Sequence, residues 1–132
     1  MRLEQVHTTP DPYVPYLLSQ AIKAGGIVYV SGQAGVSGDG KIVGNGDFDK
    51  QADQAFRNLE RALTAGGSSL AKVIKVTIFL TSMSNFSKIV ELRRKWFTAP
   101  YPADTIVEVS ALYSPEAMVE IEAVAITADD AA

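Results

Sequence analysis

Cysteine is absent from this sequence, and histidine occurs only once, as His7. The absence of cysteine excludes disulfide bonds, thiolate metal ligands and a cysteine nucleophile. A single histidine, placed just before a proline-rich segment, cannot supply the groups that a zinc site or a Ser/His/Asp triad needs. We therefore expect an ordinary surface or packing role for His7, no metal site, and no hydrolysis by either of these routes.

Basic residues and long apolar runs are also few. The 12 Lys and Arg are outnumbered by 15 Asp and Glu, which gives a net charge of -3. The chain thus has no excess of positive charge to neutralise nucleic acid phosphates. No stretch approaches the ~18 apolar residues of a membrane-spanning helix, and residues 1–7 lack the apolar core of a secretory signal. The sequence predicts a cytoplasmic protein with no nucleic acid or membrane partner.

The apolar residues that are present suffice for one core. The chain has 132 residues, of which 47% are hydrophobic, and this is within the range of a single globular domain covering residues 1–132.

The first half of the chain predicts strands followed by a helix. Residues 2–7 fit a short strand, and three prolines within residues 10–15 predict a loop. Residues 19–31 alternate in polarity around two central glycines, which is typical of a β-hairpin. In residues 47–67 the apolar side chains recur at helical spacing, with an aspartate at the start and two glycines at the end. That pattern predicts an amphipathic helix of about four turns.

The second half predicts a strand, a helix and two further strands. Alternation within residues 73–80 places Ile74 on the same face as Val76, Ile78 and Leu80. Residues 104–112 and 118–127 are rich in Val, Ile and Ala, and the turn residues between them predict that these two strands pair with each other.

The predicted helix of the second half begins at Ser82 or Ser84. Its apolar stripe consists of Phe86, Ile89, Val90, Trp96 and Phe97. The basic run at residues 93–95 lies near its C-terminal end, where the helix dipole favours positive charge, and is interpreted as a solvated face rather than an anion site.

These elements predict an α+β fold in which two helices cover one face of a mixed sheet of about six strands. The strands are apolar on their other face too, and that face would stay exposed in a monomer. We therefore expect a homo-oligomer that closes sheet against sheet.

Two features of the strands mark candidate site residues. Glycines follow the second hairpin strand, and they allow close approach of the backbone to another group, so Gly32 and Gln33 are candidates for a pocket wall. Glu120 lies among apolar neighbours on the last strand, where burial of its carboxylate without partners would be costly. It is either exposed at a sheet margin or placed in a polar cavity, and the sequence leaves both alternatives open.

Five segments together resemble the RidA/YjgF family, also called the perchloric-acid-soluble or endoribonuclease L-PSP family. They are residues 19–25 (SQAIKAG), 28–33 (VYVSGQ), 70–81 (LAKVIKVTIFLT), 107–109 (VEV) and 119–123 (VEIEA). The resemblance covers nearly the whole chain. It implies a chorismate-mutase-like fold, a homotrimer with pockets at its subunit interfaces, and hydrolysis of enamines and imines such as 2-aminoacrylate to keto acids and ammonia without a cofactor.

The resemblance also assigns site residues. Glu120 matches the pocket glutamate of the family, which implies that it positions water and is the catalytic residue. Ser31, Gly32 and Gln33 match the wall of the cleft, and the backbone near Thr105 would contribute to holding the ligand.

The sequence departs from the family pattern at three places. Asp104 occupies the position of the arginine that grips the substrate carboxylate in the deaminases, Leu18 that of a pocket tyrosine, and Val90 that of an asparagine on the second helix. The chain is thus expected to be a divergent member that lacks the catalytic arginine. Asp104 either makes the cleft negative or simply caps the strand or pairs with a nearby basic residue.

Two functions follow as hypotheses. The first is a cofactorless imine deaminase with a non-standard substrate, in which Glu120 acts as general base on water. The second is a non-catalytic trimer that binds a neutral or cationic small molecule in the same cleft. An endoribonuclease is disfavoured by the net negative charge.

Overall fold

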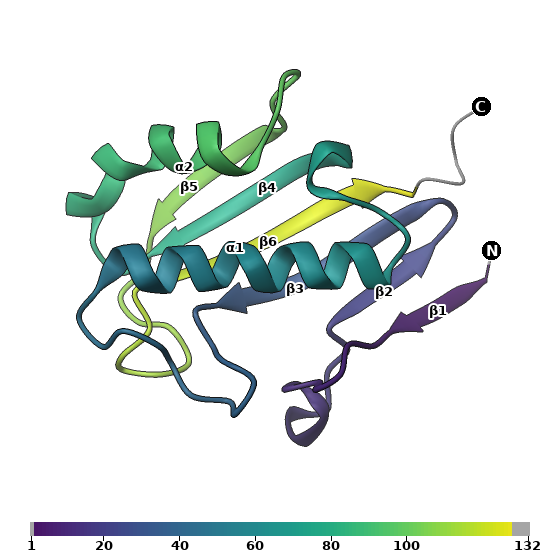
Figure 1. The fold of residues 1–132 in the computed structure, drawn as a ribbon, viewed down its shortest axis with the longest axis horizontal. Coiled ribbons are helices and arrows are strands. Elements are labelled where there is room, and N and C mark those ends of the chain that lie inside the picture. Colours follow the sequence, from purple (N-terminus) through teal and green to yellow (C-terminus); the bar gives the residue numbers. More distant parts are fainter. Residues whose placement is uncertain (1, 128–132) are drawn as a thin grey trace.

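The computed structural model describes residues 2–127 and forms one six-stranded sheet with two α-helices packed on the same face (Figure 1). The strand order is β1-β2-β3-β6-β4-β5, antiparallel throughout except for the parallel pair β4 and β5. The strands are β1 (Leu3–Val6), β2 (Ala21–Ala24), β3 (Ile27–Ala34), β4 (Val73–Leu80), β5 (Ala103–Glu108) and β6 (Val119–Ile126), and the helices are α1 (Phe48–Ala65) and α2 (Ile89–Trp96). The predicted α+β fold is confirmed.

Local sequence signals determine the first half of the fold. Gly25 and Gly26 both have positive φ (57° and 79°) and join β2 to β3 in the predicted hairpin. The Asp47 carboxylate caps α1 by accepting the N–H of Lys50 at 3.1 Å, and Gly66 ends the helix. The predicted bounds of this helix are therefore confirmed.

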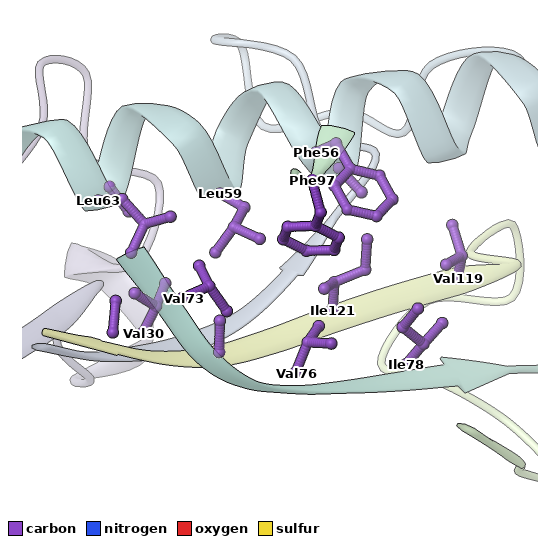
Figure 2. Close-up of a cluster of buried hydrophobic side chains, with 14 of the residues drawn as sticks. Val30, Phe56, Leu59, Leu63, Val73, Val76, Ile78, Phe97, Val119 and Ile121 are labelled. Atoms are coloured by element: carbon purple, nitrogen blue, oxygen red, sulfur yellow. The ribbon is translucent and has the colours of Figure 1, made fainter. Parts of the chain in front are cut away.

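The core lies between the helices and the sheet (Figure 2). Phe56 and Leu63 from α1 pack with Ile78 of β4 and Ile121 of β6, and all four are essentially inaccessible to solvent. The ring of Phe56 stacks on Trp96 of α2 with 5.4 Å between centroids. Burying each large apolar side chain contributes about 1.5–3 kcal/mol, so this layer determines which face of the sheet the helices cover.

The last two strands do not pair with each other, contrary to the prediction. β6 lies between β3 and β4, and β5 pairs only with β4, at the edge of the sheet. A parallel pair needs a crossover connection, which the segment containing α2 supplies, and the chain then returns to fill the gap beside β4. The turn after β5 is therefore a connection across β4 and not a hairpin.

The predicted face of Ile74 is wrong. The pairing of β4 with β6 shifts register between Val73 and Lys75, so Val73 is buried and Ile74 is 46% exposed. A β-bulge adds one residue to the alternation, and this reverses the faces on either side of it.

The predicted second helix is shorter and less apolar than expected. Residues Met83–Lys88 form a 3₁₀-helix capped by Ser82, and α2 begins at Ile89. Phe86 and Val90 are 45% and 50% exposed, so the predicted stripe is wrong at these two positions. The basic run at residues 93–95 is fully ion-paired: Arg93 with Asp104, Arg94 with Glu91 and Lys95 with Asp53.

The face of the sheet opposite the helices is uncovered in the described chain (Figure 1). Phe79 of β4 lies on this face between its cross-strand neighbours Val107 and Glu120. Tyr29 of β3 is 52% exposed beside Val124. We refer to this surface as the open face. Within residues 2–127, neither helix is long and apolar enough to cross a membrane.

Candidate functional site

The candidate site lies where β3 and β6 run side by side, around Glu120 and Gly32. Their pairing is irregular between Val30 and Gln33, which leaves Gly32 unpaired in the ladder and beside the Glu120 side chain. A Cβ atom on Gly32 would lie only 2.6 Å from Cδ and 2.7 Å from Oε2 of Glu120. Only glycine therefore lets the backbone of β3 approach this carboxylate so closely.

The Glu120 carboxylate is half-buried and lacks a cationic partner. Among the described residues, none donates a hydrogen bond to it or forms an ion pair with it. Burial raises its pKa above the ordinary glutamate value, and the negative charge of Glu122, two residues along the same face, raises it further. A carboxylate of raised pKa at an accessible surface is suited to accept a proton from water.

Two tyrosines, Tyr13 and Tyr113, lie within reach of the Glu120 charge. The Tyr13 hydroxyl donates to the carbonyl oxygen of Gly32 at 2.6 Å. Its pKa is raised by burial and then by the charges of Glu120 and Tyr113. The pKa of Tyr113 is raised in turn by burial, Tyr16 and Glu120. The charge of Glu120 thus acts on both Tyr13 and Tyr113, while Tyr16 acts on Tyr113.

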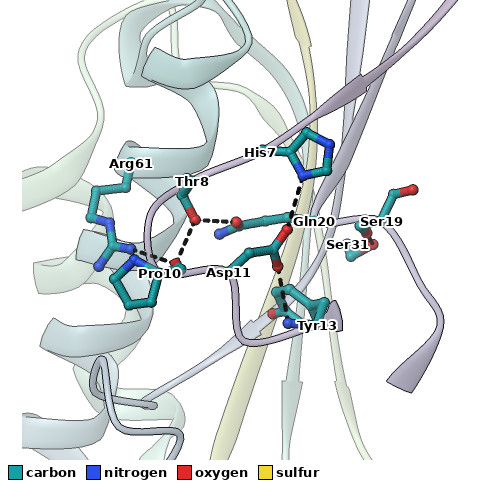
Figure 3. Close-up of polar contacts among 9 residues, drawn as sticks. All are labelled: His7, Thr8, Pro10, Asp11, Tyr13, Ser19, Gln20, Ser31 and Arg61. Atoms are coloured by element: carbon teal, nitrogen blue, oxygen red, sulfur yellow. Dashed lines mark hydrogen bonds and ion pairs between the residues drawn. The ribbon is translucent and has the colours of Figure 1, made fainter. Parts of the chain in front are cut away.

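The loop that carries Tyr13 is held by side-chain hydrogen bonds (Figure 3). The Asp11 carboxylate accepts the N–H of Tyr13 at 3.0 Å and pairs with the exposed His7 at 3.3 Å. The Thr8 hydroxyl donates to the side-chain oxygen of the buried Gln20. The exposed position of His7 agrees with its predicted surface role. The prolines predict only an irregular loop, and these hydrogen bonds hold that loop against the rest of the chain.

Two other predicted site residues, Ser31 and Gln33, form hydrogen bonds within the chain, whereas Leu18 is exposed. The Ser31 hydroxyl donates to the Ser19 carbonyl at 2.7 Å and ties the start of β2 to β3 (Figure 3). The amide of Gln33 donates to the Ser31 carbonyl at 2.8 Å and is only 1% exposed, so it supports the wall from inside. Leu18 is 43% exposed in the segment that precedes β2.

Asp104 lies on the opposite face of the sheet from Glu120. It is the neighbour of the buried Val76 in the β4–β5 register and therefore faces the helices. Arg93 Nε of α2 donates to Asp104 Oδ2 at 2.8 Å, which confirms the interpretation that Asp104 pairs with a nearby basic residue. The second oxygen, Oδ1, is buried without a partner in the described chain. The two carboxylates of one chain cannot line the same cavity.

The remaining two predicted residues divide between the faces. Val90 is on α2, on the helix side with Asp104. Thr105 points to the open face, where its hydroxyl accepts a hydrogen bond from Lys75 Nζ at 2.6 Å. One chain thus brings Ser31, Gly32 and Glu120 together with Tyr13 and Tyr113, and holds Asp104 and Val90 apart from them.

Sequence reasoning missed the tyrosines. Tyr13 and Tyr16 belong to the proline-rich loop, which the proline pattern identifies only as irregular. The available signal was the concentration of aromatic residues in an irregular segment, because binding residues often lie on loops held by a rigid scaffold.

The surface elsewhere offers weaker candidates. A hollow of about 510 Å³ between α1 and α2 contains Asp53, Arg57 and Lys95, but these three residues already pair with one another. Across residues 2–127, no group of three or more His, Cys, Asp or Glu side chains is arranged to hold a metal ion.

Comparison with known proteins gives consistent matches. The family model "Endoribonuclease L-PSP" matches residues 6–127. The chain belongs to this family, the RidA/YjgF family. A RutC family protein of Pyrococcus horikoshii is 40% identical over 116 residues, covering 88% of this chain and 90% of the relative. A 2-iminobutanoate/2-iminopropanoate deaminase of Dermatophagoides farinae is 34% identical over 125 residues, with 95% of each chain covered.

A solved structure also shares the fold of this chain. A Rid family protein of unknown function from Yersinia pestis superposes with a TM-score of 0.88 at 36% identity, covering 96% of this chain and all of the other. The RidA family relationship therefore extends over the sheet, both helices and the segments around Glu120.

Proposed function

We propose that the protein is a cofactorless hydrolase that deaminates enamines or imines at a site built around Glu120. The observation that carries the proposal is a desolvated carboxylate, without a cationic partner in the described chain, held against the backbone of Gly32. The imine deaminase of Dermatophagoides farinae, 34% identical over 95% of each chain, supports the reaction class.

The geometry suggests how Glu120 would act. Its carboxylate takes a proton from a water molecule, whose oxygen attacks the imine carbon. A C–O bond forms, the C=N π electrons move to nitrogen, and the nitrogen takes up a proton. The carbinolamine then loses ammonia as its C–N bond breaks, and the hydroxyl proton leaves by way of Glu120. Imine and water become a carbonyl compound and ammonia, with no oxidation or reduction.

The substrate should differ from carboxylated imines. Asp104 stands at the position that the family resemblance assigns to an arginine, and it forms a neutral pair with Arg93. A charged hydrogen bond to a substrate carboxylate is worth ~1.5–3 kcal/mol, so its loss weakens binding by roughly ten- to a hundredfold. Imines such as 2-aminoacrylate are therefore expected to be poor substrates.

A homotrimer would complete the site. Asp104 and Val90 lie on the helix side of the sheet and Glu120 on the open face, so one ligand can meet both sets only at a contact between copies. Three copies joined through their open faces would also cover the apolar residues there. Sedimentation equilibrium is expected to give three times the chain mass, and a monomer at micromolar concentration would contradict this assembly.

Ammonia release from a panel of enzymatically generated imines, with and without a carboxylate, tests the proposed function. The wild type should hydrolyse at least one carboxylate-free imine, and Glu120→Gln should lower that rate by about 10²–10⁴-fold. Glu60→Gln is the matched control, because Glu60 is an exposed residue on α1. Absence of ammonia above the buffer rate for every imine, or full activity of Glu120→Gln, would refute the proposal.

A non-catalytic binding protein is the second candidate. The exposed ring of Tyr113, within reach of the Glu120 charge, favours it, because it provides contact surface without any chemistry. Thermal shifts induced by small molecules on the same preparation, in the absence of turnover, would support this candidate over the first.

A further inference from the structure

We propose that the Glu120 site selects small organic cations, and that its substrates are protonated imines with an unsubstituted nitrogen and no carboxylate. This rests on the proposed function and specifies its substrate class. The observation behind it is that Glu120 lies against Gly32, whose carbonyl binds the Tyr13 hydroxyl at 2.6 Å, with Tyr113 within reach of the Glu120 charge.

The tyrosines give the site surfaces that attract cations. Tyr113 is 58% exposed in the single chain, so its ring is available to a ligand, whereas Tyr13 is held in place by its hydrogen bond to Gly32. Aromatic rings attract organic cations through the negative potential of their faces, and several rings beside one carboxylate are a recurring way to bind ammonium groups. A ring stacked against the ligand would also exclude water from it and strengthen its attraction to Glu120.

Negative charge dominates the neighbourhood. Glu122 follows Glu120 on the same face, and the charges of Glu116 and Asp11 reach Tyr113 and Tyr13 respectively. Asp11 is balanced by His7 when that residue is protonated.

Two basic residues on elements that adjoin the site have partners other than Glu120. Lys75 on the open face bonds to Thr105, and Arg93 bonds to Asp104 on the other side of the sheet. A ligand carboxylate would therefore meet net negative charge at this site, and a ligand cation would neutralise it.

A cationic substrate also suits the reaction. Protonation of an imine withdraws electrons from its carbon and makes it the better electrophile, and the Glu120 carboxylate attracts the resulting iminium. Water adds to the carbon as Glu120 takes one of its protons, and this proton passes to nitrogen. The C–N bond then breaks, its electrons leave with ammonia, and the hydroxyl proton passes by way of Glu120 to the ammonia. Iminium and water give a carbonyl compound and ammonium, so atoms, charge and electrons balance without a co-reactant.

Two stable compounds of matched shape provide the test. Isopropylammonium mimics the iminium of a simple ketone, and 2-aminoisobutyrate is the same skeleton with a carboxylate added. Binding is followed by the amide chemical shifts of the wild-type chain. Isopropylammonium should shift the signals of Gly32 and Glu120 and bind about tenfold or more tightly than 2-aminoisobutyrate, while neutral isopropanol should cause no saturable shift.

Variants separate the two parts of the site. Tyr113→Leu should weaken isopropylammonium binding by about three- to tenfold, and Glu120→Gln by more than tenfold. Tyr101→Leu removes another exposed tyrosine, at 55% exposure, that lies before β5, and it should bind like the wild type. Unchanged dispersion of the amide spectrum shows that each variant is folded, so that a lost signal reports the site.

The outcomes distinguish this inference from the proposed function. Equal or tighter binding of 2-aminoisobutyrate, or shifts located away from Gly32 and Glu120, overturns the cation site even if the wild type hydrolyses imines. Selective ammonium binding that depends on Glu120 and Tyr113 supports the cation site even if no imine yields ammonia, in which case the proposed function fails alone.

Discussion

Two acidic residues on opposite faces of one sheet experience contrasting environments. Asp104 faces the helices, is 13% exposed as a side chain, and receives a hydrogen bond from Arg93 at 2.8 Å. Glu120 faces the open side, two strands away, and has tyrosines and Gly32 around it in place of a cation.

This contrast shows that the face of the sheet on which a carboxylate lies determines whether it needs a charged partner. On the helix side, the Asp104 side chain is mostly buried, so its carboxylate needs a protein partner. On the open side, Glu120 keeps access to solvent or ligand, and its burial is only partial. Within the described chain, Asp104 is thus the carboxylate with a charged partner and Glu120 the one without.

The largest expected effect compares the two faces directly. Ile121→Ala removes a fully buried side chain beneath α1 and should lower the free energy of unfolding by ~2–5 kcal/mol. Val124→Ala removes a partly exposed side chain from the open face of the same strand and should have a clearly smaller effect. Urea denaturation at low protein concentration measures both. Equal losses would mean that the open face is packed as tightly as the helix face.

Gly32→Ala probes the close approach at the candidate site. Its Cβ would lie 2.6 Å from Glu120 Cδ, so we expect a loss of ~1–3 kcal/mol in unfolding free energy. In a Glu120→Ala background the same change should cost much less, because the obstructing atoms are gone. A double-mutant cycle by urea denaturation measures this coupling, and additive effects would refute the contact.

Arg93→Ala tests whether the Asp104 carboxylate depends on its charged partner. It leaves a mostly buried carboxylate unpaired and should lower stability by ~1–3 kcal/mol. Arg94→Ala, which breaks an exposed pair with Glu91 on the same helix, is the control and should lower stability by only ~0.2–1 kcal/mol. Thermal and urea unfolding compare the two, and equal effects would show that Asp104 does not depend on Arg93.

The ion pair between Arg93 and Asp104 also determines what the substitution Asp104→Arg should do. From sequence, that substitution should restore a grip on a substrate carboxylate. In the structure it places two guanidinium groups together, so the single change should destabilise the protein. Exchanging both residues, Arg93→Asp with Asp104→Arg, is expected to recover much of that stability in urea unfolding. If the single variant is as stable as the wild type, the pair is weaker than its geometry indicates.

Sequence periodicity predicted the parts of the fold that depend on local chemistry. The hairpin at Gly25-Gly26 and the helix between Asp47 and Gly66 follow from turn and capping residues alone. The insertion of β6 between β3 and β4, and the bulge that exposes Ile74, depend on contacts between distant segments, which no local pattern encodes.

The candidate site was predictable to a similar degree. Gly32 and Glu120 stood out as a glycine after a strand and a carboxylate among apolar residues. The hydrogen bond from Tyr13 to Gly32 spans 19 residues, and the pair of Arg93 with Asp104 joins a helix to an edge strand. Both contacts depend on the tertiary fold. The second one gives Asp104 a charged partner, which Glu120 lacks in the described chain.

The most direct test of the account is a carbon-detected NMR titration of the Glu120 side-chain carboxyl in the wild-type protein. Its pKa should lie above the ordinary glutamate value of about 4.3, because burial and Glu122 disfavour the charged form. Since the folded state then holds this proton more tightly than the unfolded state, Glu120 should reduce stability as pH rises from the ordinary value through the raised pKa. Glu120→Gln should abolish that part of the pH dependence. A midpoint at or below the ordinary value would reveal a compensating partner and contradict the claim that Glu120 is a desolvated carboxylate without one.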